Sequence, residues 1–186
     1  MKRLDEILDY NDKFVKDKKY EEYSTTKNPN KKIVIVSCMD TRLTELLPRA
    51  MNIKNGDAKI IKNAGATIIH PFGSVTRSIL VAIYEFEADE VIIVGHSGCG
   101  MSNLNVDSFI DKIIHRGISK DTIDTLYNSG INISKWIGGF ESVEESVRES
   151  VKVMQNHPLI PKGINIHGLI IDSDTGALDI VVNGYK

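Results

Sequence analysis

The segments IVIVSCMDTRL at residues 33–43 and VIIVGHSGCGM at residues 91–101 share one plan. Each begins with four β-branched apolar residues and continues into a polar turn. A continuous apolar run without alternation is typical of a strand that is buried on both faces of a parallel sheet. The two segments hold both cysteines of the chain, Cys38 and Cys99, and the second also holds His96. They therefore predict two neighbouring strands that bring Cys38, His96 and Cys99 to one point.

The rest of the chain alternates between the same kind of apolar run and helical patterns. Short apolar runs predict strands at residues 33–36, 58–62, 91–94, 166–171 and 178–182. Apolar residues at helical spacing predict helices at residues 2–17, 43–50, 74–87, 106–114, 119–127 and 142–157. The last of these begins with a capping box, Ser142 and Glu145, and stops at Pro158. Apolar residues nearly encircle the helix at 74–87, so we expect it to be deeply buried, and we expect residues 130–140 to be irregular.

This alternation predicts an α/β fold in which residues 1–186 form a single domain. We expect a mostly parallel central sheet of about five strands, with helices on both faces. The tight turn SDTG at residues 173–176 makes the last strand antiparallel to its predecessor, as an edge strand. Residues 1–30 form an N-terminal helix and loop, which can pack on the domain itself or on a partner subunit.

The composition excludes several classes of protein. The formal net charge is −2 and no basic patch is present, so nucleic acid is not an expected partner. The longest apolar runs, of roughly four to six residues, are too short to span a bilayer, so we expect no membrane association. Acidic residues interrupt the N-terminal segment MKRLDEILDYNDKF, which argues against a signal peptide. We therefore expect a cytoplasmic protein whose two cysteines stay reduced and act as ligands or nucleophiles.

Cys38, His96 and Cys99 are ligands of the kind that zinc prefers. His96 and Cys99 lie in one glycine-rich turn, so both can reach one ion, and Cys38 supplies a third ligand from the neighbouring strand. Three protein ligands and one open position are typical of a catalytic zinc site. Two thiolates neutralise the charge of Zn²⁺, so its bound water is less acidified than at a three-histidine site, where the pKa is roughly 7. We therefore predict one zinc ion per chain and an activity that rises toward mildly alkaline pH.

Asp40 and Arg42 follow Cys38 closely enough to act at the same ion. Asp40 can occupy the fourth position and block it, or it can accept a hydrogen bond from metal-bound hydroxide. The guanidinium fork of Arg42 suits a carboxylate. If Arg42 holds Asp40, the fourth position is open to water, and if the pair is broken, Asp40 can bind the metal and close the site. Both orientations are chemically reasonable, so a pH-linked switch is one interpretation.

Other interpretations of the two cysteines stay open. Isolated cysteines are most often plain buried side chains, and a closed structural zinc site with Asp40 as the fourth ligand is also consistent with the sequence. A disulfide or redox pair leaves His96, Asp40 and Arg42 without a role. A zinc nucleobase deaminase requires H-x-E followed by P-C-x-x-C, and neither pattern is present.

Three motifs together resemble those of the β-class carbonic anhydrases. They are C-x-D-x-R at residues 38–42, NAG at residues 63–65 and H-x-x-C-G at residues 96–100. The resemblance extends through GDAKIIKNAG at 56–65, RS at 77–78, VGHSGCGM at 94–101 and HGLIID at 167–172. It covers nearly the whole chain and is greatest for the shorter bacterial and archaeal branch, whereas the N-terminal helix and residues 102–140 match less distinctively.

The resemblance implies reversible hydration of carbon dioxide to bicarbonate and a proton by zinc-bound hydroxide. Cys38, His96 and Cys99 match the zinc ligands of the family. Asp40 and Arg42 match its gating dyad, in which Asp40 becomes the fourth ligand in a closed state. The basic unit of the family is a dimer that often exchanges N-terminal helices, so the resemblance also implies a homodimer or a dimer of dimers.

Four further residues are candidates for the substrate pocket. Gly100 matches a position of the family whose backbone N–H can hold a bound anion. Gly65 is expected to shape the backbone near the metal, and Lys59 can approach the mouth of the pocket. His70, in the loop before Pro71, is a candidate proton shuttle.

Two other functions are consistent with the same motifs. One is hydrolysis of another small linear substrate, such as carbon disulfide, on the same scaffold. The other is a non-catalytic zinc-binding protein with a permanently blocked site. The pair Asp40 and Arg42 argues against the second function, because a purely structural zinc site has no need for the arginine.

Overall fold

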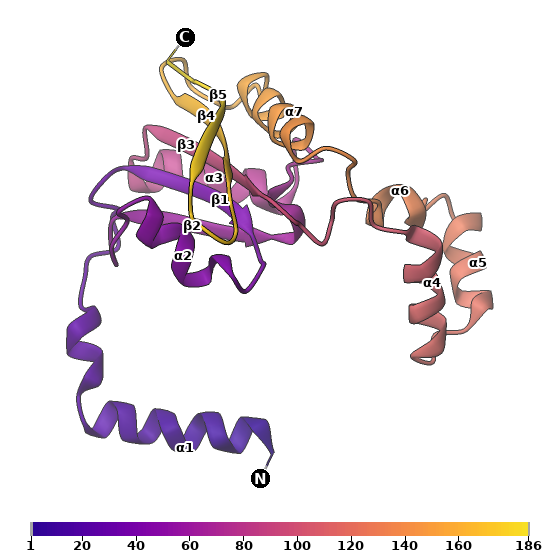
Figure 1. Ribbon diagram of the computed structural model, residues 1–186, viewed down its shortest axis with the longest axis horizontal. Helices are drawn as coiled ribbons and strands as arrows, with labels where there is room; N and C mark the ends of the chain where they lie inside the picture. The colour runs from indigo at the N-terminus through magenta and orange to yellow at the C-terminus, as the bar shows by residue number, and fades with distance from the viewer. Residues whose placement is uncertain (1, 186) are drawn as a thin grey trace.

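The computed structural model describes residues 2–185, which contain a five-stranded sheet with the order β2-β1-β3-β4-β5 (Figure 1). The strands are β1 (Ile33–Cys38), β2 (Ala58–Asn63), β3 (Glu90–His96), β4 (Asn165–Ile171) and β5 (Leu178–Val182). The first four pair in parallel, and β5 pairs antiparallel with β4 at the edge. The predicted α/β fold with a mostly parallel sheet and an antiparallel edge strand is therefore confirmed.

Helices connect and cover the strands. They are α1 (Arg3–Lys16), α2 (Leu43–Ala50), α3 (Ser74–Phe86), α4 (Val106–His115), α5 (Lys120–Asn128), α6 (Ile133–Ile137) and α7 (Val143–Gln155), with short 3-10 helices η1 (Lys19–Tyr23) and η2 (Ala64–Ala66). The expectation that residues 130–140 are irregular was wrong in part, because α6 forms there. The Asn132 side chain caps this helix by accepting a hydrogen bond from the Lys135 N–H. One and a half turns are too short to give a readable periodicity.

Two buried clusters fix the layers of the fold. On one face of the sheet, Val34 and Ile93 pack against α3 and α7. On the other face, Ile35 and Val94 pack against Leu43 and Leu47 of α2. Strands β1 and β3 are thus covered on both faces, which explains why their sequences show no alternation between apolar and polar residues.

Helix α3 is buried on one side rather than all round. Ile79 and Ile83 are buried against the sheet, but Val81 is 43% exposed and Tyr84 is 60% exposed. The expectation of deep burial was therefore wrong. The apolar residues on the outer side of α3 have no covering element among residues 2–185.

Helix α7 can lie close to the sheet because two strand positions are glycine. A Cβ atom on Gly168 would lie 2.6 Å from Val147, and one on Gly95 would lie 2.8 Å from both Val143 and Val147. The predicted capping box of α7 is confirmed in its Ser142 half, since the Ser142 hydroxyl accepts a hydrogen bond from the Glu145 N–H at 3.2 Å. This close packing holds β3 and β4 together beneath one helix.

The N-terminal helix stands apart from the sheet. Figure 1 shows α1 extending away from the body of the molecule, with α4, α5 and α6 projecting on another side. No residue of α1 is buried, and Leu4 and Ile7 are each 63% exposed. Among residues 2–185, no helix is long and apolar enough to cross a membrane.

Candidate metal centre

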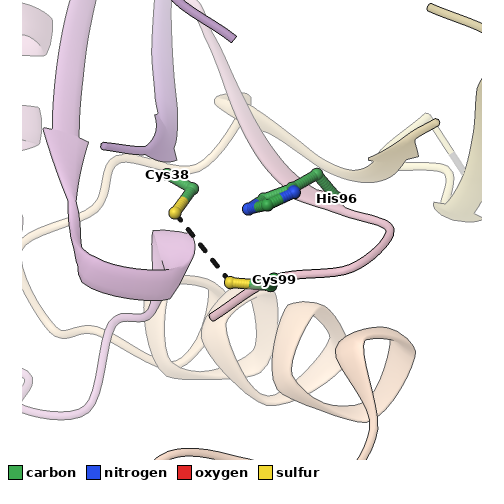
Figure 2. Close-up of side chains that lie close together, drawn as sticks. All are labelled: Cys38, His96 and Cys99. Atoms are coloured by element: carbon green, nitrogen blue, oxygen red, sulfur yellow. Dashed lines mark hydrogen bonds between the residues drawn. The ribbon is translucent and has the colours of Figure 1, made fainter. Parts of the chain in front are cut away.

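The three predicted ligands converge at one edge of the sheet. Strands β1 and β3 are parallel neighbours, so Cys38 at the end of β1 and His96 at the end of β3 lie side by side. Cys99 returns from the turn after β3. The ligand atoms of Cys38, His96 and Cys99 all lie within 4.8 Å of one another (Figure 2). All three residues are buried, so the predicted convergence is confirmed.

A hydrogen bond from Nδ1 orients the imidazole of His96 and leaves Nε2 available as a ligand atom. Its Nδ1 lies 2.9 Å from the carbonyl oxygen of Ser97. A carbonyl oxygen can only accept, so Nδ1 carries the proton and Nε2 has a free lone pair. Nε2 is buried and makes no hydrogen bond with any group in residues 2–185. Figure 2 shows the ring pointing toward the two sulfur atoms, which is where a metal ion would satisfy Nε2.

The two sulfur atoms are also arranged for a cation. Cys38 Sγ and Cys99 Sγ are 3.9 Å apart, and both residues are free cysteines rather than a disulfide, in which the sulfurs lie about 2 Å apart. Burial raises the pKa of the Cys99 thiol. A divalent cation between the sulfurs would reverse this effect by stabilising thiolates. The Gly65 N–H donates to Cys38 Sγ at 3.4 Å, and this bond also favours a thiolate. The donor set therefore fits a thiophilic metal ion.

Asp40 lies beside these ligands and is paired with Arg42. Arg42 Nε donates to Asp40 Oδ1 at 3.0 Å, and Arg42 Nη2 donates to Oδ2 at 2.8 Å. The Arg42 backbone N–H also donates to Oδ1, at 2.9 Å. These bonds hold the pKa of Asp40 well below its usual range, so this carboxylate is ionised at neutral pH. Of the two orientations left open by the sequence, this structure has Asp40 on Arg42, with Oδ2 3.9 Å from His96 Nε2.

Arg42 has two further partners that the sequence did not reveal. Its Nη2 donates to the Gly98 carbonyl oxygen at 3.0 Å, and its Nη1 donates to the Ser173 hydroxyl at 3.0 Å. Ser173 belongs to the tight turn between β4 and β5, and 131 positions separate it from Arg42. Local sequence carries no signal for such a contact, because only the sheet order brings the two segments together.

Gly65 lies close to the metal group in space, through its bond to Cys38, and Gly100 lies next to Cys99 in the chain. Gly65 has a φ of +77°, and a Cβ atom there would lie 2.9 Å from the ring of Phe140 and 3.2 Å from Met101. Both the backbone conformation and the space therefore require glycine at residue 65. Gly100 directly follows Cys99 and is exposed, and a Cβ atom at this position would meet nothing within 4 Å. The anion-binding role of the Gly100 N–H stays a prediction.

Lys59 does not join the group, so the expectation that it reaches the pocket mouth was wrong. It is the second residue of β2, at the opposite end of the strand from the metal ligands. Its Nζ lies 3.9 Å from the centre of the Phe86 ring and donates to the Lys27 carbonyl oxygen. His70 is exposed in the loop before α3, and its proposed shuttle role stays a prediction.

A largely apolar cavity of about 680 Å³, which is also lined by Glu141, Glu145 and Glu149, adjoins the group. Met101 and Phe140 line it and also pack in the same cluster as Cys38 and Cys99. The three candidate ligands themselves are not among its lining residues. The side chains of Met101 and Phe140 therefore separate the cavity from the candidate ligands.

Comparisons with known proteins agree with this geometry. The family model described as carbonic anhydrase matches residues 33–178, which include Cys38, His96 and Cys99. The crystal structure of β-carbonic anhydrase isoform I from Trichomonas vaginalis matches with a TM-score of 0.90 and 36% identity, covering 100% of both chains. The chain belongs to the β-class carbonic anhydrases.

Two relatives that are named for different substrates are also similar to the chain. The chain is 59% identical over 186 residues to YvdA of Bacillus subtilis, which carries the provisional name of a carbonic anhydrase. That match covers 100% of this chain and 94% of the relative. A carbon disulfide hydrolase of Acidithiobacillus thiooxidans is 30% identical over 158 residues, covering 80% of this chain and 76% of the relative. The family therefore includes enzymes named for two different small substrates.

Replacing one candidate ligand tests the metal centre directly. We expect Cys99→Ser to lose most of the metal after zinc loading and dialysis, because a serine hydroxyl is a much weaker ligand than a thiolate. Elemental analysis per folded chain gives the metal content. The matched control is His157→Gln, which changes another buried histidine outside the group and should keep the metal. Full metal content in Cys99→Ser would remove Cys99 from the ligand set.

Proposed function

We propose that this β-class carbonic anhydrase catalyses the zinc-dependent, reversible hydration of carbon dioxide to bicarbonate and a proton. One observation carries the proposal: the buried donors Cys38, His96 and Cys99 converge next to Asp40, whose carboxylate is held by Arg42. A metal site that served stability alone would have no need for the Asp40–Arg42 pair. The membership of the family supports the same activity.

Zinc is the metal that best suits the donor set. Two thiolates and one imidazole are common zinc ligands, and three protein ligands leave one position open. When bound, zinc lowers the pKa of water and so supplies a nucleophile near neutral pH. The tautomer of His96, with its proton on Nδ1, leaves Nε2 free for the ion. We infer one zinc ion per chain and a reducing compartment such as the cytoplasm, where the thiol ligands persist.

Asp40 and Arg42 orient the nucleophile. Asp40 Oδ2 is 3.9 Å from His96 Nε2, so its carboxylate would lie beside an ion held by the three ligands. An ionised carboxylate can only accept, so Asp40 would accept a hydrogen bond from the attacking group and fix its direction. Arg42 keeps this carboxylate in place through two parallel hydrogen bonds. If Arg42 released Asp40, the carboxylate could take the fourth position itself and close the site.

The surroundings of the site support a small apolar substrate and an anionic product. Met101 and Phe140 border both the metal group and the apolar cavity, and carbon dioxide carries no charge and needs no hydrogen-bond partner. The exposed backbone N–H of Gly100 would hold bicarbonate, and the proton would leave through solvent or through His70. Gly65 supports this arrangement through its N–H bond to Cys38 Sγ.

We also propose that the functional unit is a homodimer, which can pair further into a dimer of dimers. Helix α1 presents Leu4, Ile7, Leu8 and Val15 to solvent, and each of these residues is more than half exposed. An exposed apolar stripe on a helix that leaves the body of its own chain suits burial on a second copy. Exchange of the N-terminal helices would cover the stripe.

Carbon dioxide hydration by the zinc-loaded chain is the central test. We expect stopped-flow assays from about pH 6.5 to about pH 9 to show hydration whose rate rises with pH, and we expect removal of zinc to abolish it. The same samples should be assayed for carbon disulfide hydrolysis, because one relative is named for that activity. Absence of carbon dioxide hydration with zinc bound would overturn the proposal, and hydrolysis of carbon disulfide alone would reassign the substrate.

Arg42→Ala tests the dyad. We expect the variant to keep its metal, since Arg42 is not a ligand, and to lose at least roughly tenfold in kcat/KM, because Asp40 would lose its two side-chain bonds. Arg49→Ala is the matched control, since Arg49 forms an exposed pair with Glu45 on α2 away from the site. Activity of Arg42→Ala equal to that of the control would refute the orienting role.

A charged double substitution in α1 tests the dimer. We expect Leu4→Glu/Ile7→Glu to shift the chain toward monomer in sedimentation, because two carboxylates cannot be buried in an apolar interface. Asp9→Gln changes the polar side of the same helix and should leave the mass unchanged. A wild-type chain that sediments as a monomer, or a double variant that remains a dimer, would rule out this use of α1.

A further inference from the structure

Ser173 is a buried polar residue at the start of the turn between β4 and β5, and it is only 7% exposed. Its hydroxyl accepts a hydrogen bond from Arg42 Nη1 at 3.0 Å and donates one to the Ser97 carbonyl oxygen at 3.1 Å. Its backbone N–H donates to the Ser97 hydroxyl at 3.0 Å. A hydroxyl has one donor and two acceptor positions, so the donor of Ser173 is committed to Ser97 and one acceptor position to Arg42.

The Ser97 carbonyl oxygen connects this contact to the metal group. It accepts from Ser173 Oγ at 3.1 Å and lies 2.9 Å from His96 Nδ1, which also donates to it. One oxygen thus receives a bond from the residue that holds Arg42 and another from a candidate metal ligand. The continuous path runs from Arg42 through Ser173 and the Ser97 carbonyl to His96.

The sheet gives Ser173 a rigid base. Strands β3 and β4 are parallel neighbours with His96 paired to Ile171, and the Ser97 N–H donates to the Ile171 carbonyl oxygen at 3.1 Å. The segments that follow β3 and β4 therefore leave the sheet side by side. Asp172 then fixes the turn, since its Oδ1 accepts from the backbone N–H of Asp174 and from the backbone N–H and hydroxyl of Thr175.

Arg42, by contrast, needs an anchor. Its side chain is 44% exposed, so the two bonds to Asp40 fix the two side chains relative to each other but do not by themselves anchor the pair to the rest of the fold. Apart from Asp40, its side-chain partners in residues 2–185 are the Gly98 carbonyl oxygen and the Ser173 hydroxyl. Gly98 lies in an exposed turn with a φ of +60°, whereas Ser173 is buried on the sheet edge. Ser173 is thus the firmer of these two contacts.

We propose that Ser173 is a positioning residue, whose hydroxyl sets the place of Arg42, and through it of Asp40, relative to the imidazole of His96. Ser173 touches neither substrate nor metal and acts through Arg42. The inference rests on the proposed function for its effect on rate, but the position of Arg42 can be measured without any assay of activity.

The kinetic experiment compares three variants of the full-length, zinc-loaded chain. We expect Ser173→Ala to lose roughly tenfold in kcat/KM for carbon dioxide, the size expected for one hydrogen bond to a charged group, while it keeps its zinc. Ser173→Thr keeps the hydroxyl and should stay within about twofold of wild type. Thr175→Val removes another hydroxyl of the same turn that does not contact Arg42. Asp172 Oδ1 keeps its bonds from the backbone N–H groups of Asp174 and Thr175, so the turn should hold and kcat/KM should also stay within about twofold of wild type.

The second experiment observes Arg42 itself by ¹⁵N NMR of arginine-labelled protein, with the Nε–H signal assigned by Arg42→Lys. We expect a protected signal in wild type, Ser173→Thr and Thr175→Val. In Ser173→Ala this signal should move and exchange with water faster, as for a solvent-exposed arginine. A role confined to filling the core would change the melting temperature but leave this signal in place.

Several outcomes would overturn the inference. The first is a Ser173→Ala variant with wild-type kcat/KM and an unchanged Arg42 signal. The second is a stable Ser173→Thr variant that behaves like Ser173→Ala. The third is a Ser173→Ala variant that loses zinc in proportion to its loss of activity. If Ser173→Thr does not fold, the Arg42 signal of Ser173→Ala decides. If the wild-type chain does not hydrate carbon dioxide, the proposed function fails, and the NMR comparison still supports or refutes the positioning role.

Discussion

The parallel pairing of β1 and β3 is the constraint on which the rest of the structure depends. It brings the carboxyl ends of two buried strands to one edge, so that Cys38 and His96 become neighbours although 57 residues lie between them in the chain. Burial of the strands on both faces then keeps these side chains away from water. The buried Nε2 of His96 has no hydrogen-bond partner in residues 2–185, which is unfavourable, and a cation shared with the two sulfur atoms would relieve it.

Close approach of the backbone makes this edge compact. Glycine at residues 95 and 168 lets α7 lie directly on β3 and β4, and Gly65 lets the backbone after β2 reach Cys38. Larger side chains at residues 95 and 168 would push α7 away from the strands, and one at residue 65 would collide with Phe140 and Met101. These glycines therefore support the part of the fold that carries the candidate ligands.

A series of hydrogen bonds leads from Asp40, beside the candidate ligands, to the edge of the sheet. Asp40 stands next to the ligands, Arg42 holds Asp40, and Ser173 and the Gly98 carbonyl oxygen hold Arg42. Asp40 accepts hydrogen bonds from Arg42, and Arg42 donates further bonds to Ser173 and Gly98, so the carboxylate stays ionised and paired with Arg42. The Ser97 carbonyl oxygen joins the end of this series to His96, so the orientation of the dyad and that of the imidazole share one support.

The sequence by itself determined the strands, the antiparallel edge and the candidate ligands, because β-branched runs, turn residues and ligand spacing are local features. The position of Lys59 near the start of the strand at 58–62 was already readable from the sequence. The sequence could not determine that Asp40 lies on Arg42, or that α3 and α1 leave apolar faces exposed. Nor could it identify Ser173 as the partner of Arg42. Those facts depend on which segments meet across the sheet, and the contact between Arg42 and Ser173 exists only because β1, β3 and β4 lie in that order.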